Sequence, residues 1–218
     1  MFTLTYFGYA AVLVSFEKHL LFNPGIVEGQ VLVELDQVQP SYVLVSSQAE
    51  EHLGNALLFS RKKGCVIVSN SQVINILRKE GTPSYFLEIL TSDEEMDVGK
   101  NIKIRGFKLR RGGFLAPHNL AILVESDQGS ALHLGHANEI GSLADSKPDL
   151  LCIPVAGKKK GSFDSEEAVI ATLAIKPRFV LPISGTVDQT KSYLSLLKTK
   201  ESTIIPISIS AGETFTLV

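Results

Sequence analysis

Glu50, Glu51 and His52 are the strong ligands or acid–base groups of a short polar loop. The segment around them reads "PSYVLVSSQAEEHLGNALLF" over residues 40–59, with an apolar run at Tyr42–Val45 and a helical pattern after His52. Many enzymes place reactive groups where a strand enters a polar loop, because loops carry function on a rigid scaffold. Carboxylate and imidazole groups at such a position could hold a metal ion or transfer a proton.

The elements around this loop are predicted to be a strand before it and a helix after it. Residues 41–46 form a near-continuous apolar run, which is expected of a strand buried on both faces. Residues 53–63 place apolar side chains on one helical face. Residues 65–70 predict the next strand, and Ser71 is the expected N-cap of a helix over 72–80.

The last third of the chain repeats this order of elements. The segment "KPDLLCIPVAG" echoes "QPSYVLVSSQ", each with a proline, a polar residue, an apolar run and a loop. Asp164 and Glu167 have the spacing of a capping box, and Asp188 is the expected N-cap of the last helix. Two related halves can pack sheet on sheet with helices outside. We therefore predict an α/β (α+β) fold, a four-layer αββα sandwich that forms a single domain over residues 1–218.

The composition is that of an ordinary globular protein. Hydrophobic residues make up 44% and charged residues 20% of the 218 residues, and the net charge is −2. This charge gives no reason to expect nucleic acid or a membrane as a partner. Cys65 and Cys152 lie in apolar runs, so we expect buried free thiols. The N-terminal segment lacks a basic region and no apolar stretch could span a bilayer, so we expect a cytoplasmic location.

The motifs as a whole resemble those of the metallo-β-lactamase fold superfamily, in its small branch of metal-dependent hydrolases that includes ascorbate-6-phosphate lactonase-like proteins. "LTYFGYAAVLVS" is similar to the opening strands of that branch, and "LLFNPG" stands where the family has an I-D-P turn. "LVSSQAEEHLGNA" stands for L-T-H-x-H-x-D-H-x-G, "LHLGHA" for H-x-G-D, and "KPRFVLPISGT" for K-P-x-x-x-I-P-M-H-Y. The resemblance covers nearly the whole chain and implies a metallo-β-lactamase-like fold.

The resemblance also shows that the scaffold residues match the family while the residues implied to hold metal do not. The family's ligand positions fall on Ser47, Ala49, Glu51, His52, His136 and, at or beside it, Ser184, and one further histidine position falls near Arg110 or Arg111. A neutral hydroxyl is a weak ligand, and a methyl group has no donor atom. The first of the two metal sites is therefore expected to be lost.

The second metal site keeps three candidate ligands, Glu51, His52 and His136. Three nitrogen or oxygen ligands are the fewest that suit one ion, and such an ion would lower the pKa of a bound water to ~7. Each residue also has a structural interpretation. His52 could pack or cap at the following helix, and Glu51 at a helix start is favoured by the helix dipole. His133, inside a strand, is expected to be structural.

Five basic residues suggest another use of the same cleft. Lys158, Lys159 and Lys160 fall in a loop that borders the active site in the family, and Arg110 and Arg111 fall near a lost ligand. Fixed cations could take over the electrostatic role of two lost metal ions, because Arg and Lys suit carboxylate and phosphate groups. We predict an anion-binding site there. The opposing interpretation is that these residues are solvated loop charges.

Three functions remain open from the sequence, which by itself gives no oligomeric state. The first is a pseudoenzyme of the hydrolase fold, without a cofactor, whose vestigial cleft binds a small anionic ligand or a partner. The second is a metal-dependent hydrolase with an altered site for one zinc-like divalent ion. The third is a structural or oligomer-forming protein. We favour the first, because the changed positions are polar functional ones while the apolar framework persists.

Overall fold

The computed structural model describes residues 1–25, 37–109, 119–158 and 161–218, and these form two seven-stranded sheets with helices outside them. The first sheet has the order β14-β1-β2-β3-β4-β5-β6. Its strands are β1 (Phe2–Gly8), β2 (Ala11–Ser15), β3 (His19–Phe22), β4 (Tyr42–Val45), β5 (Val66–Ser69), β6 (Leu87–Ile89) and β14 (Thr214–Leu217). Strands β3 to β6 are parallel, and β14, β1, β2 and β3 pair antiparallel.

The second sheet has the order β13-β12-β11-β10-β9-β8-β7, which mirrors the first. Its strands are β7 (Glu95–Asp97), β8 (Lys103–Leu109), β9 (Asn119–Ser126), β10 (Gly129–His133), β11 (Leu150–Pro154), β12 (Phe179–Ile183) and β13 (Ile205–Pro206). Strands β10 to β13 are parallel, and β7 to β10 are antiparallel. The two halves predicted from the repeated segments are confirmed, because β4–β5 and β11–β12 are corresponding parallel pairs.

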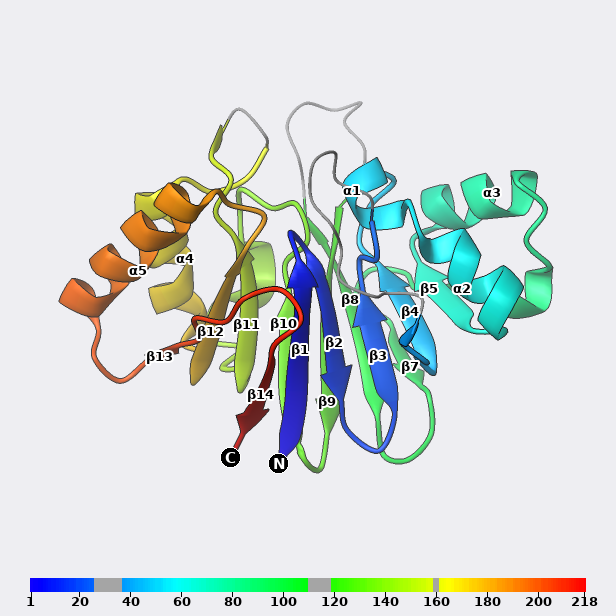
Figure 1. The fold of residues 1–218 in the computed structure, drawn as a ribbon, viewed down its shortest axis with the longest axis horizontal. Coiled ribbons are helices and arrows are strands. Elements are labelled where there is room, and N and C mark those ends of the chain that lie inside the picture. The colour runs from blue at the N-terminus through cyan, green and yellow to red at the C-terminus, as the bar shows by residue number, and fades with distance from the viewer. Residues whose placement is uncertain (26–36, 110–118, 159–160) are drawn as a thin grey trace.

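In the described ranges of the chain, five α-helices lie outside the sheets (Figure 1). They are α1 (Glu50–Leu53), α2 (Ala56–Lys63), α3 (Ser71–Lys79), α4 (Ser165–Ile175) and α5 (Val187–Lys200), and there are two short 3₁₀ turns at Ser84–Phe86 and Gly141–Leu143. One apolar core lies between the sheets, a second lies under α4 and α5, and a third lies under α2 and α3. This arrangement confirms the predicted four-layer αββα sandwich.

Three helix starts differ from the prediction. The helix expected over 53–63 is two helices, because the chain breaks at Gly54 and Asn55 between α1 and α2. The N-cap of α3 is Asn70, whose side chain accepts a hydrogen bond from Val73 N, so Ser71 is the first helical residue. The capping box at Asp164 is confirmed.

The N-cap of α5 also differs from the prediction, since it is Thr186 and Asp188 lies in the first turn. Thr186 forms a capping box with Gln189. Cys65 and Cys152 are buried and free, as predicted. No helix in the described part of the chain is long and apolar enough to cross a membrane.

Candidate functional site

Strand ends from both sheets meet at one edge of the sandwich. Leu120 N, in β9, donates to Ser46 O just beyond β4 at 2.8 Å. Gly135, just beyond β10, has φ +61°, and a Cβ atom there would lie 2.5 Å from Ser46 Oγ and 2.7 Å from Asn119 Oδ1. Residues at the carboxyl ends of parallel strands in the two sheets therefore touch directly, the usual place for a site in an open sheet with parallel strands.

His52 lies at the centre of this edge and is fully buried. Its Nδ1 lies 2.8 Å from Ser46 Oγ and 2.9 Å from Ser47 Oγ. An imidazole nitrogen carries either one proton or one lone pair, so these hydroxyls occupy the hydrogen-bonding capacity of Nδ1. The helix that carries His52 is held in place by Gly25, where a Cβ atom would lie only 1.9 Å from the backbone carbonyl of Glu51.

His136 packs against His52, with 4.2 Å between the ring centroids. Its Nε2 lies 3.6 Å from Glu51 Oε1 and 3.4 Å from Tyr9 Oη. The structure thus brings the three predicted ligands Glu51, His52 and His136 together, which agrees with the predicted grouping of their loops. Tyr9 joins them from the turn between β1 and β2, and its φ of 49° places it in the left-handed region.

His133 is structural, as its position inside a strand predicted. Its Nδ1 accepts a hydrogen bond from Gly135 N at 3.0 Å, and its Nε2 lies 3.0 Å from Ala10 O. The proton is therefore on Nε2, which donates to that carbonyl. The ring stacks on Phe22. Burial lowers the pKa of His133 to about 4, so the imidazole is neutral at physiological pH.

Two buried asparagines connect the loops around the histidines. Asn23 Oδ1 accepts from Ser46 N at 2.8 Å, and Asn23 Nδ2 lies 3.5 Å from His133 Nδ1. Asn119 Oδ1 accepts from His136 N at 3.1 Å, and Asn119 Nδ2 donates to Leu134 O at 2.9 Å. An amide can donate and accept at once, so each asparagine links two strand ends.

Ser184 directly follows β12, and the resemblance implies that the family's terminal histidine falls at or beside it. It has φ 61°, and its backbone N donates to Tyr9 O at 2.8 Å. The side chain is 5% exposed, and its hydroxyl has no hydrogen-bond partner among the described residues. A buried hydroxyl without a partner is costly, so it commonly meets water, an ion or a ligand.

The side chains around His52 do not fit the two-metal centre that the resemblance implies. Ser47 Oγ is directed to His52, and Ala49 offers no donor atom. The described residues contain no group of three or more His, Cys, Asp or Glu side chains arranged to hold a metal ion. Glu51, His52 and His136 are neighbours, but their donor atoms do not converge in that way.

The predicted anion site lies largely outside the described residues. Arg110, Arg111, Lys159 and Lys160 belong to the segments that the structure does not describe. Lys158 is described, and its Nζ lies 2.8 Å from Glu167 Oε1 and 3.5 Å from Asp164 Oδ2 at the start of α4. Those carboxylates, Glu167 first, raise the pKa of the Lys158 ammonium. Lys158 therefore pairs with the carboxylates at the start of α4, with 66% of its side chain exposed.

Ser46, Asn23 and Asn119 were not predicted as parts of the site. The sequence shows only that Asn23 stands where the family has the aspartate of its I-D-P turn. The pairing of Asn119 with His136 depends on how the strands of the folded sheet lie, so no sequence signal could have found it.

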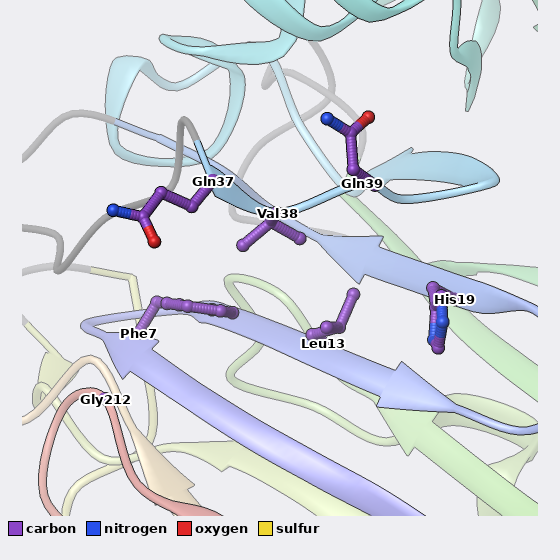
Figure 2. A pocket seen from close by; sticks show the side chains of 7 residues that line it. All are labelled: Phe7, Leu13, His19, Gln37, Val38, Gln39 and Gly212. Carbon is purple, nitrogen blue, oxygen red and sulfur yellow. The ribbon is translucent and has the colours of Figure 1, made fainter.

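Figure 2 shows a separate pocket of about 380 Å³, lined by Phe7, Leu13, His19, Gln37, Val38, Gln39 and Gly212. None of the predicted site residues that the structure describes lines it.

Known proteins similar to this chain identify its family. Residues 3–184 match the family described as the beta-lactamase superfamily domain, and the chain belongs to that family. It is 25% identical over 200 residues to a metal-dependent hydrolase of Methanosarcina mazei, covering 83% of this chain and 81% of the relative. It is 24% identical over 189 residues to a metal-dependent hydrolase of Natranaerobius thermophilus, covering 83% and 82%.

Solved structures agree with this assignment at the level of the fold. Igni18, a metallo hydrolase of Ignicoccus hospitalis, superposes with a TM-score of 0.83 at 17% identity, covering 98% of this chain and 97% of that one. The metallo-beta-lactamase fold protein YhfI of Bacillus subtilis superposes with a TM-score of 0.77 at 16% identity, covering 98% of each chain. The predicted family and fold are therefore confirmed.

Proposed function

We propose that this protein has the metallo-β-lactamase fold without metal-dependent hydrolysis, and that its cleft binds a small anionic ligand. The observation that carries the proposal is the hydrogen bonding at His52. Two serine hydroxyls approach its Nδ1 within 2.9 Å, and one of them, Ser47, stands at a family ligand position. A hydroxyl that bonds an imidazole stabilises the loop without a cation, so the loop has a metal-free means of holding its shape.

Two relatives are named as metal-dependent hydrolases, which would favour metal-dependent hydrolysis for this chain as well. The proposal differs from that expectation. Water activation needs an ion held by about three protein ligands with one position left open. The resemblance places Ser47 and Ala49 at two ligand positions that hold histidine in the family, and Ser184 at or beside a third. The remaining donors, Glu51 and His136, face each other at 3.6 Å. This donor set supports a hydrogen-bonded cluster better than a hydrolytic metal centre.

The anionic ligand is proposed from the polar groups at the edge of the cleft. The buried hydroxyl of Ser184 has no hydrogen-bond partner among the described residues. It could donate a hydrogen bond to an oxygen atom of the ligand. Lys158 and the neighbouring Lys159 and Lys160, with Arg110 and Arg111, are the cations proposed to attract it. Charge-assisted hydrogen bonds contribute ~1.5–3 kcal/mol each. Two or three of them would give roughly millimolar to micromolar affinity after the association cost.

Thermal shifts with phosphate, sulfate, citrate and nucleotides test this proposal. A ligand that binds only the folded state raises the melting temperature, and the rise should shrink at high salt. The triple variant Lys158→Ala, Lys159→Ala, Lys160→Ala should lose the rise. The double variant Lys62→Ala, Lys79→Ala removes exposed lysines from α2 and α3 and should keep it. Absence of any shift in the wild type, or an equal shift in the triple variant, refutes the anion site.

A single-metal hydrolase is the second candidate, and one specific observation favours it. The ring centroids of His52 and His136 lie 4.2 Å apart with the planes tilted by 43°, and Glu51 Oε1 lies 3.6 Å from His136 Nε2. A modest rotation of these side chains could direct them to one ion. Zinc analysis separates the candidates: one tightly held equivalent that disappears in His136→Ala, together with hydrolytic activity, supports the hydrolase and refutes the proposal above.

A further inference from the structure

An apolar groove runs between the outer faces of α4 and α5, on the side of the molecule away from α2 and α3 (Figure 1). Its volume is about 520 Å³, and its lining consists of Glu166, Val169, Ile170, Leu173, Leu196 and Lys200. These residues lie at i, i+3, i+4 and i+7 along α4 and at i and i+4 along α5, so each helix contributes one stripe. None of the residues that line the groove belongs to the histidine cluster.

The outer stripe of α4 is unusual for a helix on the surface of a sandwich. An outer helix normally carries polar residues on the face away from its sheet. From Ala168 to Ile175, α4 has no charged residue. Ala168, Ala171 and Ile175 are buried in the core below it, yet Ile170 is 67% exposed. Val169 is buried, and Leu173 and Leu196 are partly buried, so Ile170 is the most exposed apolar side chain of the groove. An exposed apolar side chain beside a groove is a feature that interfaces use.

Opposite charges stand at the two ends of this groove. The two helices run in the same direction, because they follow the neighbouring parallel strands β11 and β12. Glu166 is in the first turn of α4 and Lys200 is the last residue of α5, so the acid and the base lie at opposite ends. Among the described residues, neither has an ion-pair partner.

We propose that two copies of this chain associate through the α4–α5 groove about a two-fold axis perpendicular to the helices. A two-fold axis brings the same patch of both subunits together and reverses its direction. Ile170 then packs into the groove of the second copy, and Glu166 lies near the partner's Lys200 at both ends. The reversal makes the charge pattern self-complementary, which is why a second copy suits the groove better than an unrelated apolar helix.

Sedimentation equilibrium of the full chain, from low to high micromolar concentration, tests the dimer. Ile170→Lys places a charge in the apolar contact and should raise the dimer dissociation constant at least tenfold, about 1.4 kcal/mol. Ile170 is mostly exposed, so the monomer fold should persist, which a melting curve checks. Tyr85→Lys changes a residue that is 74% exposed in the Ser84–Phe86 turn and should leave the dimer unchanged.

A charge exchange tests the antiparallel arrangement itself. Glu166→Lys and Lys200→Glu should each weaken the dimer, because each places like charges opposite one another. The double variant should restore wild-type association, since the pairs re-form with reversed sign. A wild type that is monomeric throughout, or a dimer unaffected by Ile170→Lys, overturns the proposal. Two single variants whose losses add in the double variant refute the two-fold pairing of these charges.

Discussion

The imidazole of His133 is fixed by backbone groups and by an aromatic ring beside the histidine cluster. Its two ring nitrogens bond to the backbone at Gly135 N and Ala10 O, and its ring stacks on Phe22. Protonation would turn Nδ1 from an acceptor into a donor directed at an N–H group. Burial is the largest cause that lowers the pKa, and the charge of His136 acts in the same direction.

This depressed pKa predicts a pH dependence of stability. The pKa of His133 is about 4 in the folded state, against 6.5 for an ordinary histidine, so the unfolded chain binds more protons between these values. The contribution is fully present above pH 6.5 and is lost as pH falls towards 4. It should reach roughly 3 kcal/mol. Urea unfolding across this range should show a steeper loss in the wild type than in His133→Asn, and equal slopes would contradict it.

Gly135 lies where the chain beyond β10 approaches Ser46 of the other sheet closely. It combines φ +61° with a missing Cβ that would lie 2.5 Å from Ser46 Oγ. Gly135→Ala should lower the free energy of unfolding by about 2–3 kcal/mol, because strain and overpacking add. Gly81→Ala is the matched control, since Gly81 has φ +87° with nothing within 4 Å of the added Cβ. It should cost about 1 kcal/mol, and an equal loss in both variants would show that the contact with Ser46 is unimportant.

The spacing of apolar residues along the sequence predicted the strands and helices. The N-cap residues of α3 and α5 were predicted wrongly. Asp188 and Ser71 looked like N-caps because both residue types are favoured there. The structure places the caps at Thr186 and Asn70, where the backbone is extended and the side chain reaches the N–H three residues on. Several neighbouring polar residues can serve as a cap, and the packing of the preceding strand decides between them.

The cap of α5 can be tested directly. Thr186→Ala removes the acceptor of Gln189 N and should lower the free energy of unfolding by about 1 kcal/mol. Asp188→Ala removes only a favourable charge from the first turn and should cost a few tenths of that amount, roughly 0.3–0.5 kcal/mol. Chemical denaturation of the two variants measures the difference. A larger loss in Asp188→Ala would place the cap where the sequence predicted it.

For the molecule as a whole, the sequence predicted the four layers of the αββα sandwich and the protein family. It also predicted that the loops carrying Glu51, His52 and His136 lie at one edge. It did not predict how their neighbours pair. The hydroxyls of Ser46 and Ser47 meet His52 across a loop, and Asn119 at the start of β9 meets His136, which lies 17 residues later and beyond β10. Such pairings depend on the fold. The anion site was predicted from the positions of basic residues in the sequence alone. The sequence did not show that Lys158 pairs with carboxylates at the start of α4.

We propose that this protein holds no dinuclear metal centre. The amount of zinc bound after purification tests this proposal directly. The protein is purified with added zinc, desalted and measured for bound metal, in parallel with the metal-dependent hydrolase of Methanosarcina mazei. We expect well under two equivalents for this chain, and a melting temperature that a chelator does not change. Two tightly held equivalents, with a melting temperature that falls on chelation, would refute the proposed absence of a dinuclear centre and support a metal-dependent hydrolase.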